Sequence, residues 1–311
     1  MRKRLTRKLP LALAMLLSAC GLVRCAPEPL DLAEVEALYA DPVPPAEDPL
    51  SVYFIGHSLF GRDMPAILAQ LAGVGHRYDI QLGWGAELQA HWGDAELAGG
   101  EEENAHARFR EAHEAVESGA YDALVLTEKI TIAVTNEYHD SWHYLALWAE
   151  KAVAANPDIR LYITETWIEI EDEDAWLAHV EADLSPSWER AFIDRALATG
   201  KIDRPVYVIP GGQVMARFVR AVRARGGVDE ITGLRDLFKD NVHFNTTGAY
   251  LMALTHYAAL YGRSPVGLPH DGLLDATGQP IPPIGPEAAR LMQETVWEVV
   301  QGYKRSGRAA S

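Results

Sequence analysis

The residue types needed for nucleophilic catalysis first occur at the end of an apolar run. Ser58 stands in the segment YFIGHSLF, where a small hydroxyl follows residues that resemble a buried strand. A serine hydroxyl becomes a good nucleophile only when a base takes its proton and a third group orients that base. Ser58 is therefore either the cap of the next helix or a nucleophile that needs such partners.

A candidate base and its orienting group occur together near the other end of the chain, in DNVHFNTTGAYLMA. Asp240 and His243 are three residues apart and precede an apolar helical run. At this spacing in a turn, both side chains can project to one side, so that Asp240 orients the imidazole and the other ring nitrogen faces a hydroxyl. Thr246 and Thr247 suit the start of the helix. Ser58 and this pair together favour a nucleophile over a cap.

Apolar runs that predict buried strands alternate with segments of helical spacing. The strands are expected over residues 52–55, 78–82, 123–126, 160–163 and 206–209. The helices are expected over residues 64–72, 105–118, 144–155, 188–198, 214–225 and 287–303. Continuously apolar strands separated by helices indicate a mostly parallel sheet that is covered on both faces. The predicted fold class is therefore α/β, a three-layer α/β/α sandwich with about five strands.

In sheets of this kind, ligands bind outside the carboxyl ends of the strands. The residues that follow the five predicted strands are Gly56-His57-Ser58, Gly83-Trp84-Gly85, Thr127-Glu128-Lys129, Thr164-Glu165-Thr166 and Pro210-Gly211-Gly212.

Three segments resemble conserved blocks of the SGNH (GDSL-type) hydrolases. GHSL, at residues 56–59, resembles the first block, GWGAELQAHW resembles the second, and DNVHFNTTGAYLMA resembles the last, with its Asp-x-x-His motif. The resemblance covers residues 50 to about 261. It implies an SGNH-hydrolase, flavodoxin-like fold and an esterase that needs no cofactor and no metal.

The resemblance also implies roles for particular residues. Ser58 would be the nucleophile, His243 the general base and then the general acid, and Asp240 the group that orients His243. The backbone N–H groups of Ser58 and Gly85 would bind the oxyanion, with Gly83 as the competitor of Gly85.

The third oxyanion donor of the family is an Asn side chain, and this sequence departs from that pattern. Thr127, Glu128 and Lys129 stand in its place, and Lys129 aligns best with the missing Asn. An ionised Glu128 could not donate and would oppose the oxyanion, and loss of one donor typically costs about 10²–10³ in rate. His57 is the second departure, and its side chain is expected to point away from the nucleophile into supporting contacts.

The N-terminal segment predicts export. Residues 1–19 combine a basic start with a short apolar stretch, as in a signal peptide, and LSAC resembles a lipoprotein cleavage site that leaves Cys20 lipidated. Ordinary cleavage near Cys25, giving a secreted or periplasmic protein, is the alternative. Residues 20–49 are rich in proline and acid and are expected to form a tether with one short helix over 30–39. Residues 50–305 would form a single domain, anchored to a membrane of the bacterial cell envelope.

The charge of the chain argues against a nucleic-acid partner. The 311 residues carry a formal net charge of −16. Residues 1–19 contain five basic groups, so that a chain beginning at Cys20 has 23 basic and 44 acidic residues, a net charge of −21. A polyanion of this size repels nucleic acid.

The sequence therefore supports an esterase of the cell envelope, with short acyl groups on a carbohydrate as the preferred substrate. Five tryptophans are expected to pack in the core or at the rim, where one or two could stack on a sugar: Trp84, Trp92, Trp142, Trp148 and Trp167. The main alternative is a non-catalytic carbohydrate-binding or scaffold lipoprotein with the same fold. A nucleotide-binding protein is disfavoured because no GxGxxG or Walker sequence occurs.

A metal site is a further alternative. His139 and His143 are four residues apart and could ligate a metal on one helix face, but no third ligand is evident in the sequence.

Overall fold

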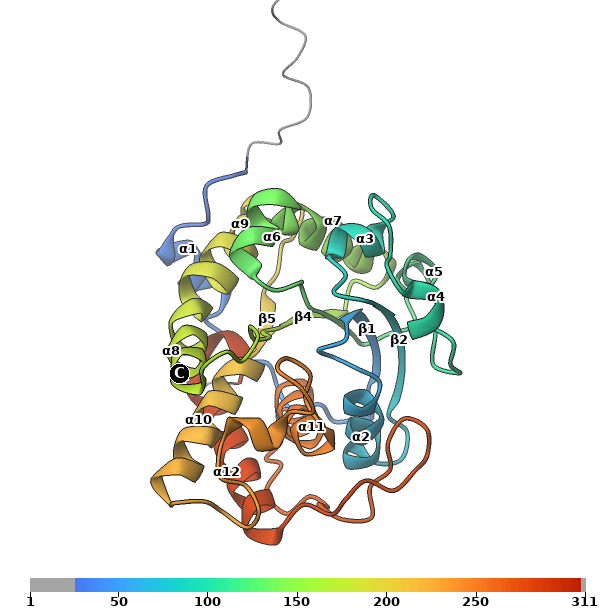
Figure 1. Cartoon of the computed structure of the whole chain (residues 1–311). Helices are drawn as coiled ribbons and strands as arrows, with labels where there is room; N and C mark the ends of the chain where they lie inside the picture. Colours follow the sequence, from blue (N-terminus) through green and yellow to red (C-terminus); the bar gives the residue numbers. More distant parts are fainter. Residues whose placement is uncertain (1–25, 309–311) are drawn as a thin grey trace, which may run out of the picture.

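Five parallel strands form the central sheet, in the order β2-β1-β3-β4-β5 (Figure 1). The computed structural model describes residues 26–308, so the predicted signal peptide and Cys20 lie outside the described residues. The strands are β1 (Ser51–His57), β2 (Arg77–Gly83), β3 (Ala123–Leu126), β4 (Arg160–Thr164) and β5 (Val206–Ile209). All five strands occur where the apolar runs predicted them, and the α/β fold class is confirmed.

Successive residues of each strand face opposite sides of the sheet, and helices cover both sides. In β1, Val52 and Phe54 belong to one buried cluster, and Tyr53 and Ile55 belong to the other. The first face is covered by α2 (Asp63–Ala72), α8 (Glu173–Asp183), α10 (Gly211–Ala224), α11 (Thr246–Tyr261) and α12 (Pro286–Gly302). The second is covered by α3 (Leu88–Trp92), α5 (Ala112–Glu117), α6 (Ile132–Tyr138), α7 (Ser141–Ala155) and α9 (Asp194–Ala198).

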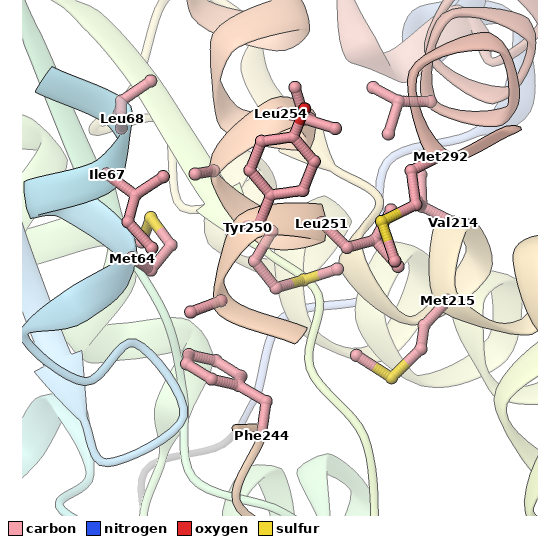
Figure 2. Packing of buried hydrophobic residues seen from close by; sticks show 14 of the residues in the cluster. Met64, Ile67, Leu68, Val214, Met215, Phe244, Tyr250, Leu251, Leu254 and Met292 are labelled. Atoms are coloured by element: carbon pink, nitrogen blue, oxygen red, sulfur yellow. The ribbon is translucent and has the colours of Figure 1, made fainter. Parts of the chain in front are cut away.

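Helix α11 lies in the middle of the first layer and is buried on nearly every side. Figure 2 shows Tyr250 and Leu254 of α11 between Met64 and Ile67 of α2 and Met292 of α12. A helix that is apolar all round is stable only when it is surrounded by protein. This packing fixes the N-terminus of α11, and with it the turn that contains Asp240 and His243.

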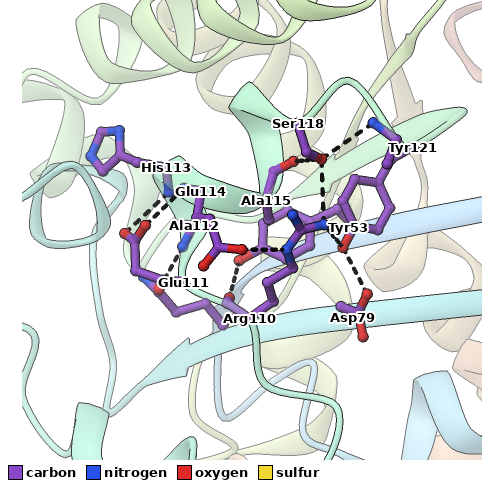
Figure 3. A network of polar contacts seen from close by, with 12 residues as sticks. Tyr53, Asp79, Arg110, Glu111, Ala112, His113, Glu114, Ala115, Ser118 and Tyr121 are labelled. Atoms are coloured by element: carbon purple, nitrogen blue, oxygen red, sulfur yellow. Dashed lines mark hydrogen bonds and ion pairs between the residues drawn. The ribbon is translucent and has the colours of Figure 1, made fainter.

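A polar network holds residues 110–121 against the sheet (Figure 3). The Tyr121 hydroxyl donates to Asp79 at 2.7 Å and accepts from the Arg110 guanidinium at 3.1 Å. The Tyr53 hydroxyl donates to the Arg110 carbonyl at 2.7 Å. Glu111 caps α5 by accepting from two backbone N–H groups of its first turn. Together these bonds attach the chain before α5 to β1 and β2.

The prediction of one helix over residues 105–118 is wrong. The structure has α5 at its end and a separate short helix, α4 (Gly100–Glu103), before it. The intervening chain runs beside the edge strand, where the Ile80 N–H donates to the Arg108 carbonyl at 3.0 Å. The backbone bond to β2 therefore takes the place of helical bonds in this segment.

The helix predicted over residues 188–198 is the end of a longer one. It begins with α8, whose N-cap Asp172 accepts from the Ala175 N–H, passes through a π-helical stretch (Leu184–Ile193) and ends in α9. Pro186 lies in that stretch. Because proline has no N–H to donate, it disfavours regular α-helix around it, and the π-helical stretch absorbs the change.

Residues 26–46, within the segment predicted as a tether, lie against the domain. Helix α1 (Leu32–Leu38) begins at Asp31 with a capping box, near the predicted short helix. The buried Tyr39 hydroxyl donates to the Val206 carbonyl of β5 at 2.6 Å. The Arg308 guanidinium donates to the Val43 carbonyl at 2.7 Å. Across residues 26–308, no helix has both the length and the apolar character needed to cross a membrane.

Candidate active site

Ser58 follows the last residue of β1, in a tight turn at the carboxyl edge of the sheet. The Phe60 N–H closes the turn by donating to the His57 carbonyl at 2.9 Å. Gly56 is required there, because a Cβ atom would lie 2.6 Å from Phe60 and 2.8 Å from Thr127. Strand β1 lies between β2 and β3, and in sheets of this order ligands bind outside the carboxyl end of the strand at which the order reverses.

Two buried histidines hold the backbone around this turn. The His57 side chain makes supporting contacts, as predicted: its Nε2 lies 3.0 Å from the Glu128 carbonyl and its Nδ1 accepts from the Leu59 N–H. His91 places Nε2 2.8 Å from the Gly56 carbonyl. Burial lowers the pKa of both imidazoles to about 4, so both are neutral near pH 7.

Asp240 and His243 form a compact turn before α11. One Asp240 oxygen accepts from the Val242 and His243 N–H groups at 2.8 and 2.7 Å. The other lies 2.8 Å from His243 Nδ1. Burial acts to raise the pKa of Asp240, but these hydrogen bonds outweigh it and lower the pKa to about 2. Asp240 is therefore ionised near pH 7. Helix α11 begins after this turn, and its N-cap is Asn245 rather than Thr246 or Thr247.

The segment after β4 packs against this turn and is hydrogen-bonded to it. The Trp167 indole N–H donates to the Val242 carbonyl at 2.9 Å, and its ring contacts Phe238 and Phe244. The Ile170 N–H donates to the Asn241 carbonyl at 2.7 Å. The Asp240 turn is thus attached to a second strand of the sheet as well as to α11.

The two distant segments meet at one hydrogen bond. His243 Nε2 lies 2.9 Å from Ser58 Oγ, although 185 residues separate them in the chain. With the proton of the neutral ring on Nδ1, facing Asp240, Nε2 is free to accept the Ser58 proton. The side chains of His243 and Asp240 are 32% and 44% exposed, so the arrangement opens to solvent.

Gly85 and Gly83 differ in their surroundings at the end of β2. A Cβ atom on Gly83 would lie 2.5 Å from Leu97 and 2.7 Å from Ala86, so this glycine serves close packing. Gly85 has φ = +50°, and its only neighbour within 4 Å of such an atom is Lys129 Cε at 4.0 Å. The open space beside Gly85 favours it over Gly83 as a donor to a bound substrate.

Lys129 lies beside Gly85, with its ammonium group bound to a carboxylate. Lys129 Nζ is 2.6 Å from Glu87 Oε1, and His139 Nε2 lies 3.7 Å from the same oxygen. Burial acts to raise the pKa of Glu87, but the hydrogen bond from Lys129 and further contacts lower it. The cation predicted at the position of the family Asn is therefore held in place by Glu87, while its side chain stays 40% exposed.

Glu128 does not face the site as an exposed anion. It is fully buried, and its carboxyl group accepts from the backbone N–H groups of Lys129 at 2.7 Å and Leu88 at 3.3 Å. Burial raises its pKa to about 8, so the group is mostly protonated near pH 7. The expected repulsion between Glu128 and an oxyanion is thereby weakened.

The comparisons with known proteins concern the fold. No protein-family model and no curated protein matches the sequence. A crystal structure of a DUF4886 family protein from Bacteroides uniformis aligns over 81% of this chain and 95% of that chain, with a TM-score of 0.50 and 15% identity. The sheet order is the flavodoxin-like 2-1-3-4-5, with Ser58 after β1 and the Asp-x-x-His turn before α11. The chain has the flavodoxin-like α/β fold that the sequence resemblance implied.

A second crystal structure, described as a "putative GDSL-like lipase" from Parabacteroides merdae, aligns over 68% of this chain and 95% of that chain. Its TM-score is 0.43 and its identity 13%. The fold that the sequence resemblance implied, a flavodoxin-like α/β sheet, is confirmed by the strand order, and the activity is a separate question.

Sequence reasoning missed several residues that position the candidate site within this fold. His91, Glu87 and the support given by Trp167 were not predicted. His91 lies within GWGAELQAHW, the segment that resembles the second block. Its place in that segment was the only indication in the sequence that His91 lies near the candidate site. Trp167 lies four residues after the end of a predicted strand, but nothing in its spacing relates it to Val242.

The tryptophans and the histidine pair have different environments. Trp142, Trp148 and Trp167 are buried, whereas Trp84 is 53% exposed at the end of β2. Among residues 26–308, no group of three or more His, Cys, Asp or Glu side chains could hold a metal ion. The structure therefore adds no third ligand to the pair His139 and His143.

Proposed function

We propose that the chain is a serine-dependent acyl hydrolase that cleaves esters. The observation that carries the proposal is the continuous pair of contacts from Ser58 Oγ to His243 Nε2, 2.9 Å, and from His243 Nδ1 to Asp240, 2.8 Å. A hydroxyl, an imidazole and a carboxylate in this order form the arrangement that activates a serine nucleophile.

In the first step, Ser58 Oγ attacks the ester carbonyl while its proton moves to His243 Nε2. The carbonyl carbon becomes tetrahedral, and negative charge develops on the former carbonyl oxygen. The N–H groups of Ser58 and Gly85 would stabilise this charge, since neither donates to another group within residues 26–308. The Lys129 ammonium group beside Gly85 would add a positive charge near the same oxygen.

In the second step, the tetrahedral carbon expels the alcohol, which takes the proton from His243 Nε2, and the acyl group remains on Ser58 as an ester. Water then gives a proton to His243 and attacks the acyl carbon. The collapse of this second intermediate returns the proton to Ser58 Oγ and releases the acid. Asp240 stays ionised throughout and stabilises the imidazolium form of His243.

Short acyl groups on a carbohydrate are the substrate that we propose. Trp84 offers an exposed indole next to Gly85, and its ring lies against Gly99. The indole N–H donates to Glu103 at 2.9 Å, which holds the ring in one orientation. A fixed aromatic face beside the oxyanion site can bind the apolar face of a sugar ring.

We further propose that lipid on Cys20 anchors the enzyme in the cell envelope. Support comes from the sequence alone: a basic and apolar leader that ends in LSAC. Membrane fractions from bacteria fed a fatty-acid analogue should contain the labelled protein, and Cys20→Ser should move it to the soluble fraction. Cys25→Ser is the matched control and should leave the labelled protein in the membrane fraction. Cleavage near Cys25 would instead leave no lipid on either cysteine, and the wild-type protein would then be unlabelled.

A fluorophosphonate probe tests the activity, because it reacts only with an activated serine. The purified protein should be labelled at Ser58 and should hydrolyse p-nitrophenyl acetate. Ser58→Ala and His243→Ala should reduce both to background, whereas Ser264→Ala, on an exposed loop, should change neither. Wild-type turnover in both active-site variants would refute the assignment.

A non-catalytic carbohydrate-binding or scaffold protein is the second candidate. The observation in its favour is the Lys129–Glu87 ion pair, which occupies a donor position that the resemblance assigns to Asn. Such a protein would not be labelled by the probe, and its Ser58→Ala variant would bind oligosaccharide as the wild type does.

A further inference from the structure

A hollow of about 420 Å³ lies between α2, the edge strand β2 and two loops. Arg62, Ala66, Ala69 and Gln70 line it from the α2 side, and Tyr78 and Ile80 line it from the sheet. Residues 106–108 and 274–278 form the remaining walls. Figure 1 shows the long loop that precedes α12 passing beside α2 and β2. The volume of the hollow falls within the range of about 300–1,000 Å³ that is usual for small-molecule sites.

Two guanidinium groups in this hollow have no acidic partner. Neither Arg62 nor Arg108 forms an ion pair with any residue of the described chain, 26–308. Arg108 lies over the Tyr78 ring, with Cζ 5.0 Å from the ring centroid. Two guanidinium groups without a paired carboxylate are notable in a chain whose net charge is −16.

The acidic residues around the hollow already have partners. Asp275 accepts from the Thr277 N–H and hydroxyl and from the Gln279 N–H, all within its own turn. Asp63 accepts from the Ala276 N–H at 3.0 Å, and Asp79 accepts from the Tyr121 hydroxyl. None of these carboxylates forms an ion pair with Arg62 or Arg108 within residues 26–308.

His106 adds a donor without an acceptor. Its Nδ1 accepts from the Arg108 N–H at 3.1 Å, so the proton of the neutral ring is on Nε2. That Nε2 atom is buried and has no hydrogen-bond partner among the described residues. Burial and the charge of Arg62 lower the pKa of His106, which favours the neutral ring. An acceptor atom of a ligand would satisfy this Nε2–H group.

The walls of the hollow are held in place without a ligand. The Gln70 side chain donates to the Leu274 carbonyl at 2.8 Å and accepts from the Leu274 N–H at 2.9 Å. The Arg108 carbonyl accepts from the Ile80 N–H of β2 at 3.0 Å. Both loops are thus attached to regular elements, so little conformational freedom remains to be lost on binding.

We propose that this hollow is a binding site for a small molecule that carries an oxyanion, a carboxylate or a phosphate group. Guanidinium groups bind such oxyanions through paired N–H donors, and the His106 N–H can take a further oxygen. The site is lined by residues other than Ser58, Asp240 and His243, so it goes beyond the proposed hydrolase activity.

Isothermal titration calorimetry of the full chain tests the site with two probes, potassium phosphate and citrate, at an ionic strength held constant with chloride. We expect saturable one-to-one binding of at least one probe. Because a hydrogen bond to a charged group contributes about 1.5–3 kcal/mol, Arg62→Gln and Arg108→Gln should each raise the Kd about 10- to 100-fold. Binding of phosphate alone identifies a phosphate site, and binding of citrate alone identifies a carboxylate site.

Arg290→Gln is the matched control, since Arg290 is exposed on α12 and paired with Glu294, and it should keep the wild-type Kd. Thermal unfolding reports whether each variant is folded. If Arg108→Gln loses its fold because Arg108 no longer covers Tyr78, the exposed Arg62→Gln decides the result. The proposal is overturned if neither probe binds saturably, or if Arg62→Gln binds as tightly as the wild type.

Discussion

The His91 side chain lies with Nε2 2.8 Å from the Gly56 carbonyl, two residues before Ser58. Its Nδ1 accepts from the Gln81 side chain at 3.0 Å, and Gln81 in turn accepts from the Ala112 N–H. A buried chain of hydrogen bonds thus runs from the start of α5 to the backbone that orients Ser58. His91 is a positioning residue in this arrangement, because it touches the backbone and not the reacting hydroxyl.

Replacement of His91 should therefore reduce activity through geometry. His91→Leu removes the His91 contact to the Gly56 carbonyl and the acceptor of the Gln81 side-chain N–H, and a buried group left unsatisfied costs about 1–3 kcal/mol. We expect a lower thermal midpoint and a lower kcat for p-nitrophenyl acetate. His91→Gln, whose amide can replace the donor to Gly56, should recover part of both. A kcat unchanged in His91→Leu would mean that this bond does not position Ser58.

Lys129→Ala tests the third oxyanion donor. If the ammonium group stabilises the transition state, kcat should fall about 10²–10³-fold with KM little changed, as for loss of one donor. Glu87→Gln should give a smaller loss, because the ammonium group remains but is no longer held by a carboxylate 2.6 Å away. Lys201→Ala, at a surface ion pair with Glu150, is the control. An unchanged kcat in Lys129→Ala would exclude Lys129 as a donor.

Gly83, the last residue of β2, and Gly85 should respond differently to an added methyl group. Gly83→Ala places a Cβ atom against Leu97 at 2.5 Å, and overpacking of this kind costs about 1–3 kcal/mol of stability. Gly85→Ala has room for the atom but keeps φ near +50°, at a cost of about 1–2 kcal/mol. We expect Gly85→Ala to lose more activity than Gly83→Ala in folded protein, measured as kcat at a temperature well below both unfolding midpoints. The reverse order would assign the donor to Gly83.

The strands could be predicted because each is a short, continuous apolar run, which is what a strand buried on both faces requires. Residues 206–209 illustrate this, since the predicted and observed limits coincide. The segment 105–118 could not be assigned correctly, because its conformation depends on a backbone bond to β2 that local spacing does not encode. Helix α8 was missed since its strongly acidic first turn resembles exposed loop.

The candidate site shows the same division between local and distant information. Ser58 and the pair Asp240 and His243 were found because each sits in a short motif, and the structure brings the three side chains together. The partner of Lys129 could not be found, since Glu87 lies 42 residues away and acidic residues are common in this chain.

The stability of the protein should pass through a maximum with pH. Burial lowers the pKa of His57, His91 and His256 to about 4, below the value of about 6.5 in an unfolded chain. Between these values the unfolded chain binds more protons, so the free energy of unfolding falls as the pH is lowered from about 6.5 to 4. Burial raises the pKa of Glu165 to about 8, and this carboxyl group has the opposite effect. The stability it contributes is lost as the pH rises from about 4.5 to 8.

Glu165→Gln removes the contribution of Glu165 to the loss of stability at alkaline pH, because an amide cannot ionise, and leaves that of Glu128. Glu165 accepts hydrogen bonds from Gln213 at the start of α10, and the substitution keeps its size. Urea unfolding at pH 5, 6, 7 and 8 should show a smaller loss of stability between pH 6 and 8 than in the wild type. Glu298→Gln, exposed on α12, should keep the wild-type slope. Equal slopes in Glu165→Gln and the wild type would contradict the assignment.

Trp84→Ala tests whether the exposed indole binds a sugar ring. Aromatic contacts of this kind contribute about 0.5–1.5 kcal/mol beyond area burial, so KM for an acetylated oligosaccharide should rise about 2- to 10-fold. The kcat/KM for p-nitrophenyl acetate should stay close to the wild-type value, because this small ester does not reach Trp84 in the proposed mode. Trp84→Phe should retain most of the oligosaccharide affinity. Tyr138→Ala, on the exposed side of α6, is the control. A parallel loss with both esters would show that Trp84 shapes the loop around Gly85, and an unchanged KM for the oligosaccharide would remove the argument for a carbohydrate substrate.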